Sequence, residues 1–427
     1  MARAKKETAL TPEERLQAAL VPDWEWPYKL PENWCWTYFK SISTIQTGKK
    51  DANYGSDEGK YPFFTCAAES IRCHGYSFDC RAILLAGNGD INNISRYNGK
   101  FEAYQRTYVV KIAEPLCFDY IFYWFKYRWF DFNKGKMFGT AIPYIRLGNL
   151  QEFPTPIPPL AEQQRIVDRI ESLFAKLDEA KEKAQAVVDS FETRKAAILH
   201  KAFTGELTAK WREEHGVSID NWKTTRFDSV AAIRSNLVDP AEYQSFPHIA
   251  PDNIEKKTGV LLEYHTIAED GVTSGKHRFY SGQILYSKIR PYLSKAVVVD
   301  FDGLCSADMY PIEAYQNARC LWYYMLSDEF LLQASTAGSR SVLPKINQKE
   351  LSALTVHLPT NDREQEEIAR ILDELFDKEQ QTKEAAEIVL DQIDLMKKSI
   401  LARAFRGELG TNDPSEESAV ELLKQLN

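Results

Sequence analysis

Apolar side chains recur at alternating intervals of four and three residues along two long stretches of the chain. In the second stretch these positions are Ile368, Leu372, Leu375, Glu379, Thr382, Ala386, Val389, Ile393, Met396 and Ile400. In the first stretch they are Ile166, Ile170, Leu173, Leu177, Ala180, Ala184, Val187, Phe191, Arg194 and Ile198. A stripe with this period predicts an amphipathic helix whose apolar seam packs on another helix. Glu379, Thr382 and Arg194 are polar breaks that we expect to fix the register of the pairing.

The two stretches are copies of one another. Residues 162–207 align with residues 364–409 without a gap, and 19 of the 46 positions are identical. Prolines precede each stretch, and Gly205 and Gly407 follow, as is typical of helix starts and stops. The equal length and register predict two helices of about 42 residues, each on the order of 60 Å, that pair antiparallel with pseudo-twofold symmetry. Two amphipathic helices packed only on their own domains remain the alternative.

The segments between the long helices read as mixed domains. Short β-rich runs lie at 83–86, 107–111, 284–287 and 295–299, and aromatic helical runs lie at 120–127 and 320–326. The aromatic runs are expected to form core. We therefore predict an α+β fold with two β-rich target-recognition domains, each followed by a spacer helix. The predicted boundaries are 1–27 for an N-terminal extension, 28–155 and 210–358 for the domains, 156–209 and 359–409 for the spacer regions, and 410–427 for an acidic tail.

Charge and composition add little about a partner until they are divided by region. The chain has a net charge of −8, but residues 28–159 hold 16 Lys/Arg against 12 Asp/Glu. Residues 360–427 hold 9 against 17, so the acidic excess belongs to the last helix and tail. Neither a membrane-length apolar run nor a secretory leader is found, and seven scattered cysteines fit a reducing compartment. A cytoplasmic location is the expectation.

The sequence offers no catalytic centre. It contains no complete phosphate-binding loop, no amino-methyltransferase tetrad and no spaced Asp and Glu-x-Lys of a restriction nuclease. The trio Cys66, Cys73 and Cys80 lies beside His74, but its spacing is not that of structural zinc sites. We expect free thiols, no metal site and no catalytic residue in this chain.

Several loops carry residues suited to a nucleic acid. Base edges are read by amide and guanidinium groups, and phosphates by basic groups and close backbone. The loops are at 87–100, 133–140, 287–295 and 335–341, with a further basic pair after residue 47. The candidate DNA contacts are Lys49, Lys50, Asn88, Asn92, Asn93, Arg96, Tyr97, Lys100, Lys134, Lys136, Thr140, Lys288, Arg290, Tyr292, Lys295, Ser339, Arg340 and Ser341. A hairpin turn is the alternative role for the loop at 87–100, and a solvated strand edge is the alternative for the loop at 287–295.

The arrangement as a whole resembles the specificity subunits of type I restriction-modification systems. The resemblance rests on two diverged domains with matching helices, and on the junctions at 158–167 and 358–369. The endings AlaPheThrGlyGluLeu at 202–207 and AlaPheArgGlyGluLeu at 404–409 also look like the family. The second junction departs from the pattern by one inserted residue and a lost proline. The resemblance covers about residues 28–409.

This resemblance implies a division of labour. Each domain would read half of a split double-stranded DNA target, and the paired helices would set the gap. Two methyltransferase subunits and translocase-nuclease subunits would dock, and S-adenosylmethionine, ATP and Mg²⁺ would belong to those partners. The implied docking surface is on the helices and their junctions, with Glu162, Gln163, Glu364 and Gln365 as candidate surface residues. A non-enzymatic coiled-coil scaffold with two protein-binding domains is the alternative function.

Overall fold

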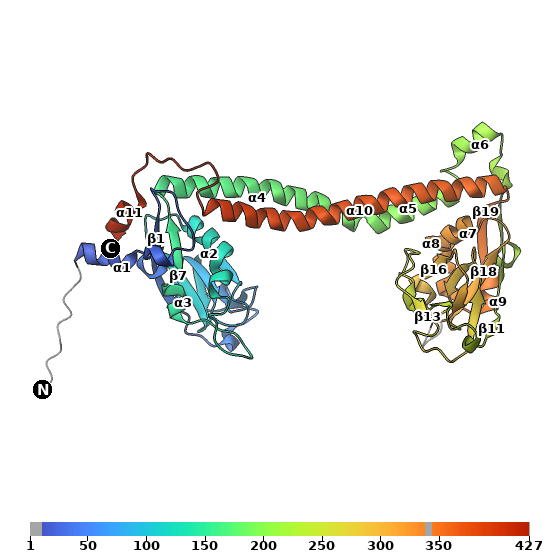
Figure 1. Ribbon diagram of the computed structural model, residues 1–427, viewed down its shortest axis with the longest axis horizontal. Helices are drawn as coiled ribbons and strands as arrows, with labels where there is room; N and C mark the ends of the chain where they lie inside the picture. Colours follow the sequence, from blue (N-terminus) through green and yellow to red (C-terminus); the bar gives the residue numbers. More distant parts are fainter. Residues whose placement is uncertain (1–10, 338–343, 427) are drawn as a thin grey trace. The chain divides into compact units, whose positions relative to one another are not determined.

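The computed structural model describes residues 11–337 and 344–426, which belong to two compact units (Figure 1). Unit 1 comprises Met1–Lys183 and Val389–Asn427, and unit 2 comprises Ala184–Ile388. Each unit contains a mixed α+β domain together with parts of the long helices. The predicted fold class is therefore confirmed at the level of the two mixed domains.

Unit 1 is built on a six-stranded sheet and a two-stranded ribbon. The sheet has the strand order β2-β7-β5-β6-β3-β4, and the ribbon pairs β1 with β8 antiparallel. The strands predicted at 83–86 and 107–111 lie in β5 and β7, which pair antiparallel. The strands are β1 (Cys35–Tyr38), β2 (Ser43–Thr47), β3 (Tyr61–Phe64), β4 (Ile71–Cys73), β5 (Phe78–Ala86), β6 (Ile94–Ala103), β7 (Thr107–Ile112) and β8 (Pro154–Ile157).

An aromatic helix fills the core of unit 1. Helix α2 (Phe118–Asn133) extends the predicted run at 120–127, and six of its rings are buried: Phe118, Tyr120, Phe122, Trp124, Phe125 and Trp129. Trp124 packs on Phe153, with centroids 5.7 Å apart, and on Phe405 from the end of the last long helix, at 5.0 Å. The shorter helices of this unit are α1 (Pro12–Ala19), α3 (Leu147–Gln151) and α11 (Ala419–Leu426).

The acidic C-terminal segment is part of this core. Leu423 of α11 is fully buried, and α11 contacts α1. The backbone N–H of Ala419 donates to the carbonyl of Asn33, at 2.9 Å. The segment predicted as a tail therefore contributes a packed amphipathic helix to unit 1.

Unit 2 repeats the central part of this plan. Its four-stranded sheet has the order β10-β18-β15-β16, which corresponds to β2-β7-β5-β6 of unit 1, and β9 pairs with β19 as β1 does with β8. A five-stranded sheet, β11-β14-β17-β12-β13, has no such match. The strands are β9 (Trp222–Arg226), β10 (Ala231–Ile233), β11 (Leu237–Val238), β12 (Pro247–Ile249), β13 (His265–Thr266), β14 (Lys276–Phe279), β15 (Ile284–Ser287), β16 (Ala296–Val298), β17 (Gly303–Cys305), β18 (Met309–Ala314) and β19 (Thr355–Pro359).

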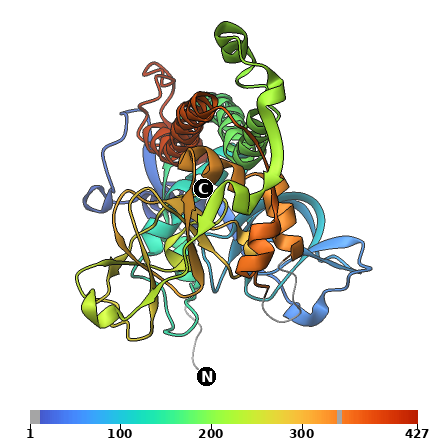
Figure 2. The same ribbon diagram turned by 90° about the vertical axis from the view of Figure 1, so that its right-hand side faces the viewer.

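The strands and helix predicted for the second domain are confirmed as β15, β16 and α7. Six consecutive residues of α7, from Cys320 to Met325, are buried. Besides α7 (Ala318–Met325), the short helices of this unit are α6 (Ala209–His215), α8 (Asp328–Ala337) and α9 (Gln348–Ala353). Helix α6 projects away from the sheets of its unit (Figure 2).

The long helices differ from each other in continuity. Helix α10 (Asp362–Ala404) is unbroken over 43 residues, whereas the first copy divides into α4 (Leu160–Asp189) and α5 (Phe191–Phe203). The break falls at Ser190, whose hydroxyl donates to the carbonyl of Ala186, at 2.6 Å. A serine hydroxyl that bonds back to its own helix bends that helix. The prediction of two equal continuous helices is therefore wrong for the first copy.

Antiparallel contacts between the long helices occur inside each unit. In unit 1, Lys397 of α10 bonds to Asp178 of α4 at 2.5 Å, and Lys181 lies 3.6 Å from Asp394. In unit 2, Arg194 of α5 pairs with Glu379 of α10 at 2.7 Å. Two of the three polar breaks predicted in the seams, Arg194 and Glu379, therefore form an ion pair with each other.

The seam of α10 does not keep the predicted phase throughout. Thr382, Val389 and Met396 are exposed, whereas their neighbours Lys383 and Leu390 are half-buried. After Glu379, the next residue of the buried stripe is Lys383, four positions on, whereas the prediction placed it at Thr382, three positions on. A helix with 3.6 residues per turn drifts against a strict seven-residue repeat, and a shift of one residue restores the buried face.

Within residues 11–337 and 344–426, no helix combines the length and apolar character needed to cross a membrane. In the same residues, all seven cysteines are free thiols, and no three His, Cys, Asp or Glu side chains are placed to hold a metal ion.

Candidate nucleic-acid interface

Two loops far apart in sequence are joined in unit 1. The loop after β5 donates from Gly89 N to Pro143 O at 2.8 Å and accepts at Gly87 O from Ile145 N at 2.9 Å. Residues 138–144 form a small hairpin, with Phe138 and Tyr144 paired. The loop 87–93 and the hairpin therefore make one surface, which we call the loop pair of unit 1.

Unit 2 has the same junction. Arg290 N donates to Pro344 O at 2.7 Å, and Ile346 N donates to Lys288 O at 2.9 Å. Each of these four residues is equivalent to the unit 1 residue that stands 201 positions earlier in the sequence. Residues 288–294 with residues 344–346 are the loop pair of unit 2. The two domains thus share a loop scaffold in the region where their sequences do not match.

The loop pairs lie away from the long helices of their own units. The second loop of each pair directly precedes a short helix, α3 in unit 1 and α9 in unit 2, and each of these helices lies below the long helices in its domain (Figure 1). The prediction placed DNA contacts in four separate loops. The structure brings 87–93 and 138–144 together in unit 1, whereas Ser339, Arg340 and Ser341 lie outside the described residues.

Several candidate side chains of unit 1 are used inside the domain. Asn93 donates to the carbonyl of Cys66 at 3.2 Å, and Arg96 forms an ion pair with Asp119. Four other candidates contact aromatic rings. The ammonium group of a lysine lies within 6 Å of a ring centroid for Lys50 on Tyr54, Lys100 on Tyr76 and Lys136 on Phe132, and the ring of Tyr97 lies as close to that of Phe64. These contacts give the residues a role in stability and reduce the case for direct DNA contact.

Four candidates of unit 1 remain exposed and close to this surface or to the loop after β2. Lys49, Asn92, Lys134 and Thr140 are exposed, and Asn88 is half-buried in the loop pair. Sequence reasoning missed Arg146, whose guanidinium lies 3.9 Å from the centroid of Phe138 at the base of the hairpin. Its proximity to the hairpin follows from the pairing of Phe138 with Tyr144, which periodicity does not reveal.

In unit 2 the candidate cations fall into two classes. The ammonium group of Lys295 donates to Pro251 O at 2.7 Å. Lys288 donates to the carbonyl of Ala307 and lies 3.8 Å from Asp308, and its side chain is only 14% exposed. These two lysines therefore stabilise the domain. Arg290 and Tyr292 are exposed on the loop pair.

Comparison with known proteins fits this architecture. A family model described as the type I restriction modification DNA specificity domain matches residues 31–188 and 219–389. The chain belongs to this family. This chain is 40% identical over 403 residues to the type I restriction enzyme EcoDI specificity subunit of Escherichia coli. The alignment covers 89% of this chain and 90% of that protein.

Solved structures of similar proteins share the fold of this specificity subunit. The HsdS subunit from Thermoanaerobacter tengcongensis aligns with a TM-score of 0.58 and 18% identity, over 90% of this chain and all of that one. A structure from work on complex assembly and conformational transition of the type I system aligns with a TM-score of 0.65 and 18% identity, over the same shares. The predicted family is confirmed.

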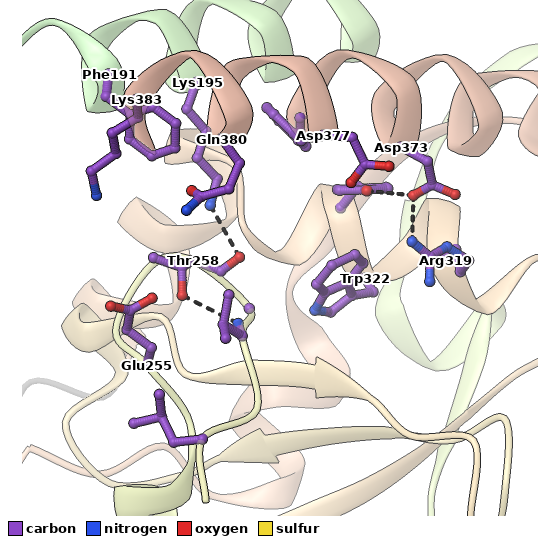
Figure 3. A pocket seen from close by; sticks show the side chains of 15 residues that line it. Phe191, Lys195, Glu255, Thr258, Arg319, Trp322, Asp373, Asp377, Gln380 and Lys383 are labelled. Atoms are coloured by element: carbon purple, nitrogen blue, oxygen red, sulfur yellow. Dashed lines mark hydrogen bonds and ion pairs between the residues drawn. The ribbon is translucent and has the colours of Figure 1, made fainter. Parts of the chain in front are cut away.

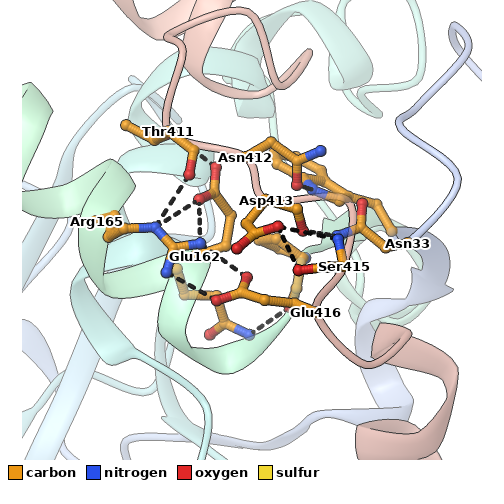
Figure 4. A network of polar contacts seen from close by, with 11 residues as sticks. Asn33, Glu162, Arg165, Thr411, Asn412, Asp413, Ser415 and Glu416 are labelled. Atoms are coloured by element: carbon orange, nitrogen blue, oxygen red, sulfur yellow. Dashed lines mark hydrogen bonds and ion pairs between the residues drawn. The ribbon is translucent and has the colours of Figure 1, made fainter.

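The four residues predicted as a docking surface are buried, so that prediction of exposure is wrong. In unit 1, Thr411 donates to Glu162 at 2.6 Å, and Arg165 bridges Glu162, at 2.9 Å, to Glu416, at 2.7 Å (Figure 4). Burial raises the pKa of Glu162, and the bonds from Thr411 and Arg165 oppose that rise. The node fastens the segment after α10 to the start of α4.

Glu364 forms the corresponding node in unit 2. Its carboxylate accepts from Thr208 at 2.9 Å, Arg212 at 2.7 Å, Asn221 at 3.0 Å and Trp222 at 3.0 Å. Burial alone would raise its pKa, but these hydrogen bonds together hold the pKa below the ordinary value. The segment after α5 is thereby fastened to the start of α10.

The adjacent glutamines are buried for a similar reason. Gln163 accepts from Cys117 N at 2.8 Å and donates to Pro158 O at 3.0 Å. Gln365 accepts from Asn317 N at 3.2 Å and donates to Pro359 O at 2.8 Å. Each glutamine therefore joins the start of a long helix to the first turn of a domain helix. This internal function explains why the Glu-Gln pair occurs in both copies.

Unit 2 also contains a cavity of about 790 Å³ between its domain and the long helices (Figure 3). The ammonium group of Lys195 donates to the carbonyls of Lys257, at 2.8 Å, and Thr258, at 3.1 Å. Burial lowers the pKa of Lys195 to about 8. On the opposite wall, Tyr323 donates to Asp373 at 2.5 Å. Lys195 thus fastens a loop of the second domain to α5.

Proposed function

We propose that this specificity subunit reads a bipartite, gapped sequence in double-stranded DNA, with one half-site for each unit. The observation that carries the proposal is the shared loop pair. The same backbone junction occurs in both units, at 87–89 with 143–145 and at 288–290 with 344–346, but it presents different side chains. A common scaffold with different exposed residues is what two readers of different half-sites require.

The chemistry of the two loop pairs suits different bases. Unit 1 presents amides at Asn88 and Asn92, which pair well with adenine edges. Unit 2 presents a guanidinium at Arg290 and a phenol ring at Tyr292. Lys49 and Lys134 are exposed cations of unit 1 that suit phosphate contacts.

We further propose that the long helices set the gap and receive the partner subunits. Two adenine methyltransferase subunits would dock on the chain, and translocase-nuclease subunits would complete the restriction enzyme. The docking surface on α10 includes Val389, Leu395 and Met396, which are exposed in unit 1 at 39%, 64% and 48%. Exposed apolar side chains on one helix face favour a protein partner. These residues replace the four buried ones as docking candidates.

In this proposal the chain itself is not catalytic. S-adenosylmethionine, ATP and Mg²⁺ are used by the partner subunits, and the chain works with them in the cytoplasm. Its own contribution is to choose the DNA sequence and to hold the methyltransferases beside it. The name and high identity of the EcoDI specificity subunit support this assignment.

Methylation sequencing tests the proposal. DNA is compared from cells that carry the methyltransferase subunit with and without this chain, and a second specificity subunit serves as the control that the methyltransferase is active. We expect adenine methylation at a two-part sequence that disappears without the chain. Replacing residues 28–155 by another recognition domain should change one half of that sequence only. Methylation that is independent of the chain would favour the scaffold function, and a change in both halves would contradict one half-site per unit.

A further inference from the structure

Arg290 stands at a backbone position that its counterpart fills with glycine. Its φ and ψ are 49° and 58°, in the left-handed region, and the equivalent Gly89 of unit 1 has a φ of 74°. Glycine adopts this conformation freely, whereas other residues do so at a cost. Backbone conformations that cost free energy are concentrated at functional sites, so the left-handed conformation of Arg290 indicates a function for its side chain.

The surrounding loop holds Arg290 in this conformation. Its N–H donates to Pro344 O at 2.7 Å, and its carbonyl accepts from Leu293 N at 2.9 Å. The buried ring of Pro291 follows directly, and Ile289 pairs with Lys345 on the preceding side. The backbone of Arg290 is therefore fixed, and its side chain leaves the loop pair in a defined direction.

The guanidinium of Arg290 is not used within the part of the chain that the structure describes. It forms no hydrogen bond or ion pair there, unlike Arg234 of the same unit, which pairs with Glu313 at 2.7 Å. The nearby carboxylate of Asp308 is occupied by Lys345, at 3.3 Å, and Lys288, at 3.8 Å. Lys288 and Lys345 thus share the carboxylate of Asp308, and Arg290 is not one of its partners.

We propose that Arg290 reads a guanine in the half-site recognised by unit 2. The inference rests on the proposed function and names the base-reading residue. The planar guanidinium matches the O6 and N7 acceptors of guanine through two hydrogen bonds. A phosphate contact needs only positive charge and does not require a side chain held in one direction. A fixed direction, held at the cost of a left-handed backbone, is useful for reading a base.

Two substitutions separate base reading from a phosphate contact. Arg290→Gly removes the guanidinium and suits the backbone, so the chain should fold at least as well as the native one. Arg290→Lys keeps the charge but loses the two-pronged geometry. Arg234→Lys, at an exposed arginine of the same unit, is the matched control. Each variant is assembled with its methyltransferase partner, and its thermal stability and methylation pattern are measured.

The native complex should require guanine at one position of the unit 2 half-site. With Arg290→Gly and Arg290→Lys, the preference at that position should fall by roughly 5- to 150-fold, which is what a two-pronged contact contributes. The unit 1 half-site and the Arg234→Lys pattern should not change. Uniformly weaker methylation with an unchanged sequence pattern, restored by lysine, would show a phosphate contact and overturn the proposal. If the native chain directs no two-part methylation, the proposed function fails instead.

Discussion

Removal of the Glu364 carboxylate should open the junction between the two copies in unit 2. Four donors converge on this buried group, from Thr208, Arg212, Asn221 and Trp222. Glu364→Ala removes the acceptor that these four donors share and leaves the Arg212 cation, whose side chain is only 11% exposed, without its counter-charge. We therefore predict local unfolding of residues 204–222 and of the first turns of α10.

The free-energy cost of Glu364→Ala is set by the unpaired charge of Arg212 rather than by the number of hydrogen bonds lost. Hydrogen bonds to a charged group contribute about 1.5–3 kcal/mol each, but four that share one carboxylate are not additive. Breaking a buried ion pair from one side costs about 3–5 kcal/mol, because the remaining charge is uncompensated. We take about 4 kcal/mol as the loss in free energy of local opening, which corresponds to amide exchange faster by about 1000-fold.

Hydrogen exchange measured by mass spectrometry on the full chain resolves this region from the rest. Glu366→Ala is the matched control, because Glu366 lies on the same turn of α10 but is exposed. In this control, the amide exchange rates of residues 204–222 should stay within about twofold of those in the native chain, since surface substitutions change stability little. Acceleration by less than about tenfold in Glu364→Ala would refute the view that this node holds the junction.

The pH dependence gives an independent check, because the equivalent Glu162 should respond in the opposite sense. The pKa of Glu364 is lowered in the folded chain, so its stabilisation is present above the ordinary value of 4.5 and is lost as pH falls through the folded pKa. The pKa of Glu162 is raised by burial, so its stabilisation is present below 4.5 and decreases as pH rises through the folded pKa. Glu364→Ala should therefore cost less in acid than at neutral pH, and Glu162→Ala more. Equal slopes would contradict this assignment.

Three further predictions concern packing and charge. Gly407→Ala should destabilise unit 1 by about 2 kcal/mol more than Gly410→Ala in thermal unfolding, because both have φ of 73° but only the first places a Cβ 2.5 Å from Pro31. Phe405→Ala should cost about 3–5 kcal/mol in urea unfolding, as a fully buried ring is lost from the aromatic core. Lys195 has a folded pKa of about 8 against 10.5, so unit 2 should gain up to about 3 kcal/mol between these pH values, and Lys195→Met should abolish that gain.

The regular parts of the fold were predictable because they depend on local pattern. Strand β7 is a short run of β-branched and aromatic residues whose first four positions are buried, and α2 and α7 are aromatic runs that a core must bury. The ends of the long helices were also predictable, since Gly205 and Gly407 adopt positive φ where the helices stop. These features depend only on residues that are close in the sequence, so one sequence is enough to predict them.

The errors arose where tertiary contacts decide. Periodicity could not show that the first helix is interrupted at Ser190, or that the seam of α10 shifts by one residue after Glu379. The family resemblance led to the prediction that Glu162 and Glu364 lie on a docking surface, but each is buried because a segment distant in sequence supplies its donors. The joining of two loops that lie more than 50 residues apart in the sequence was equally inaccessible.

The two copies have kept in common what must be buried and have changed what is exposed. The Glu-Gln pair at the start of each long helix recurs because each member satisfies backbone or side-chain groups that burial would otherwise leave unpaired. The loop pairs recur only as backbone, because main-chain bonds such as Gly89 N to Pro143 O and Arg290 N to Pro344 O do not depend on the side chains. Side chains on that scaffold are therefore free to diverge without loss of fold. Under the proposed function, a chain built in this way can change either half-site separately. Gly89 and Arg290 stand at equivalent positions of the two loop pairs, so this is the position at which to test how the sequence is read.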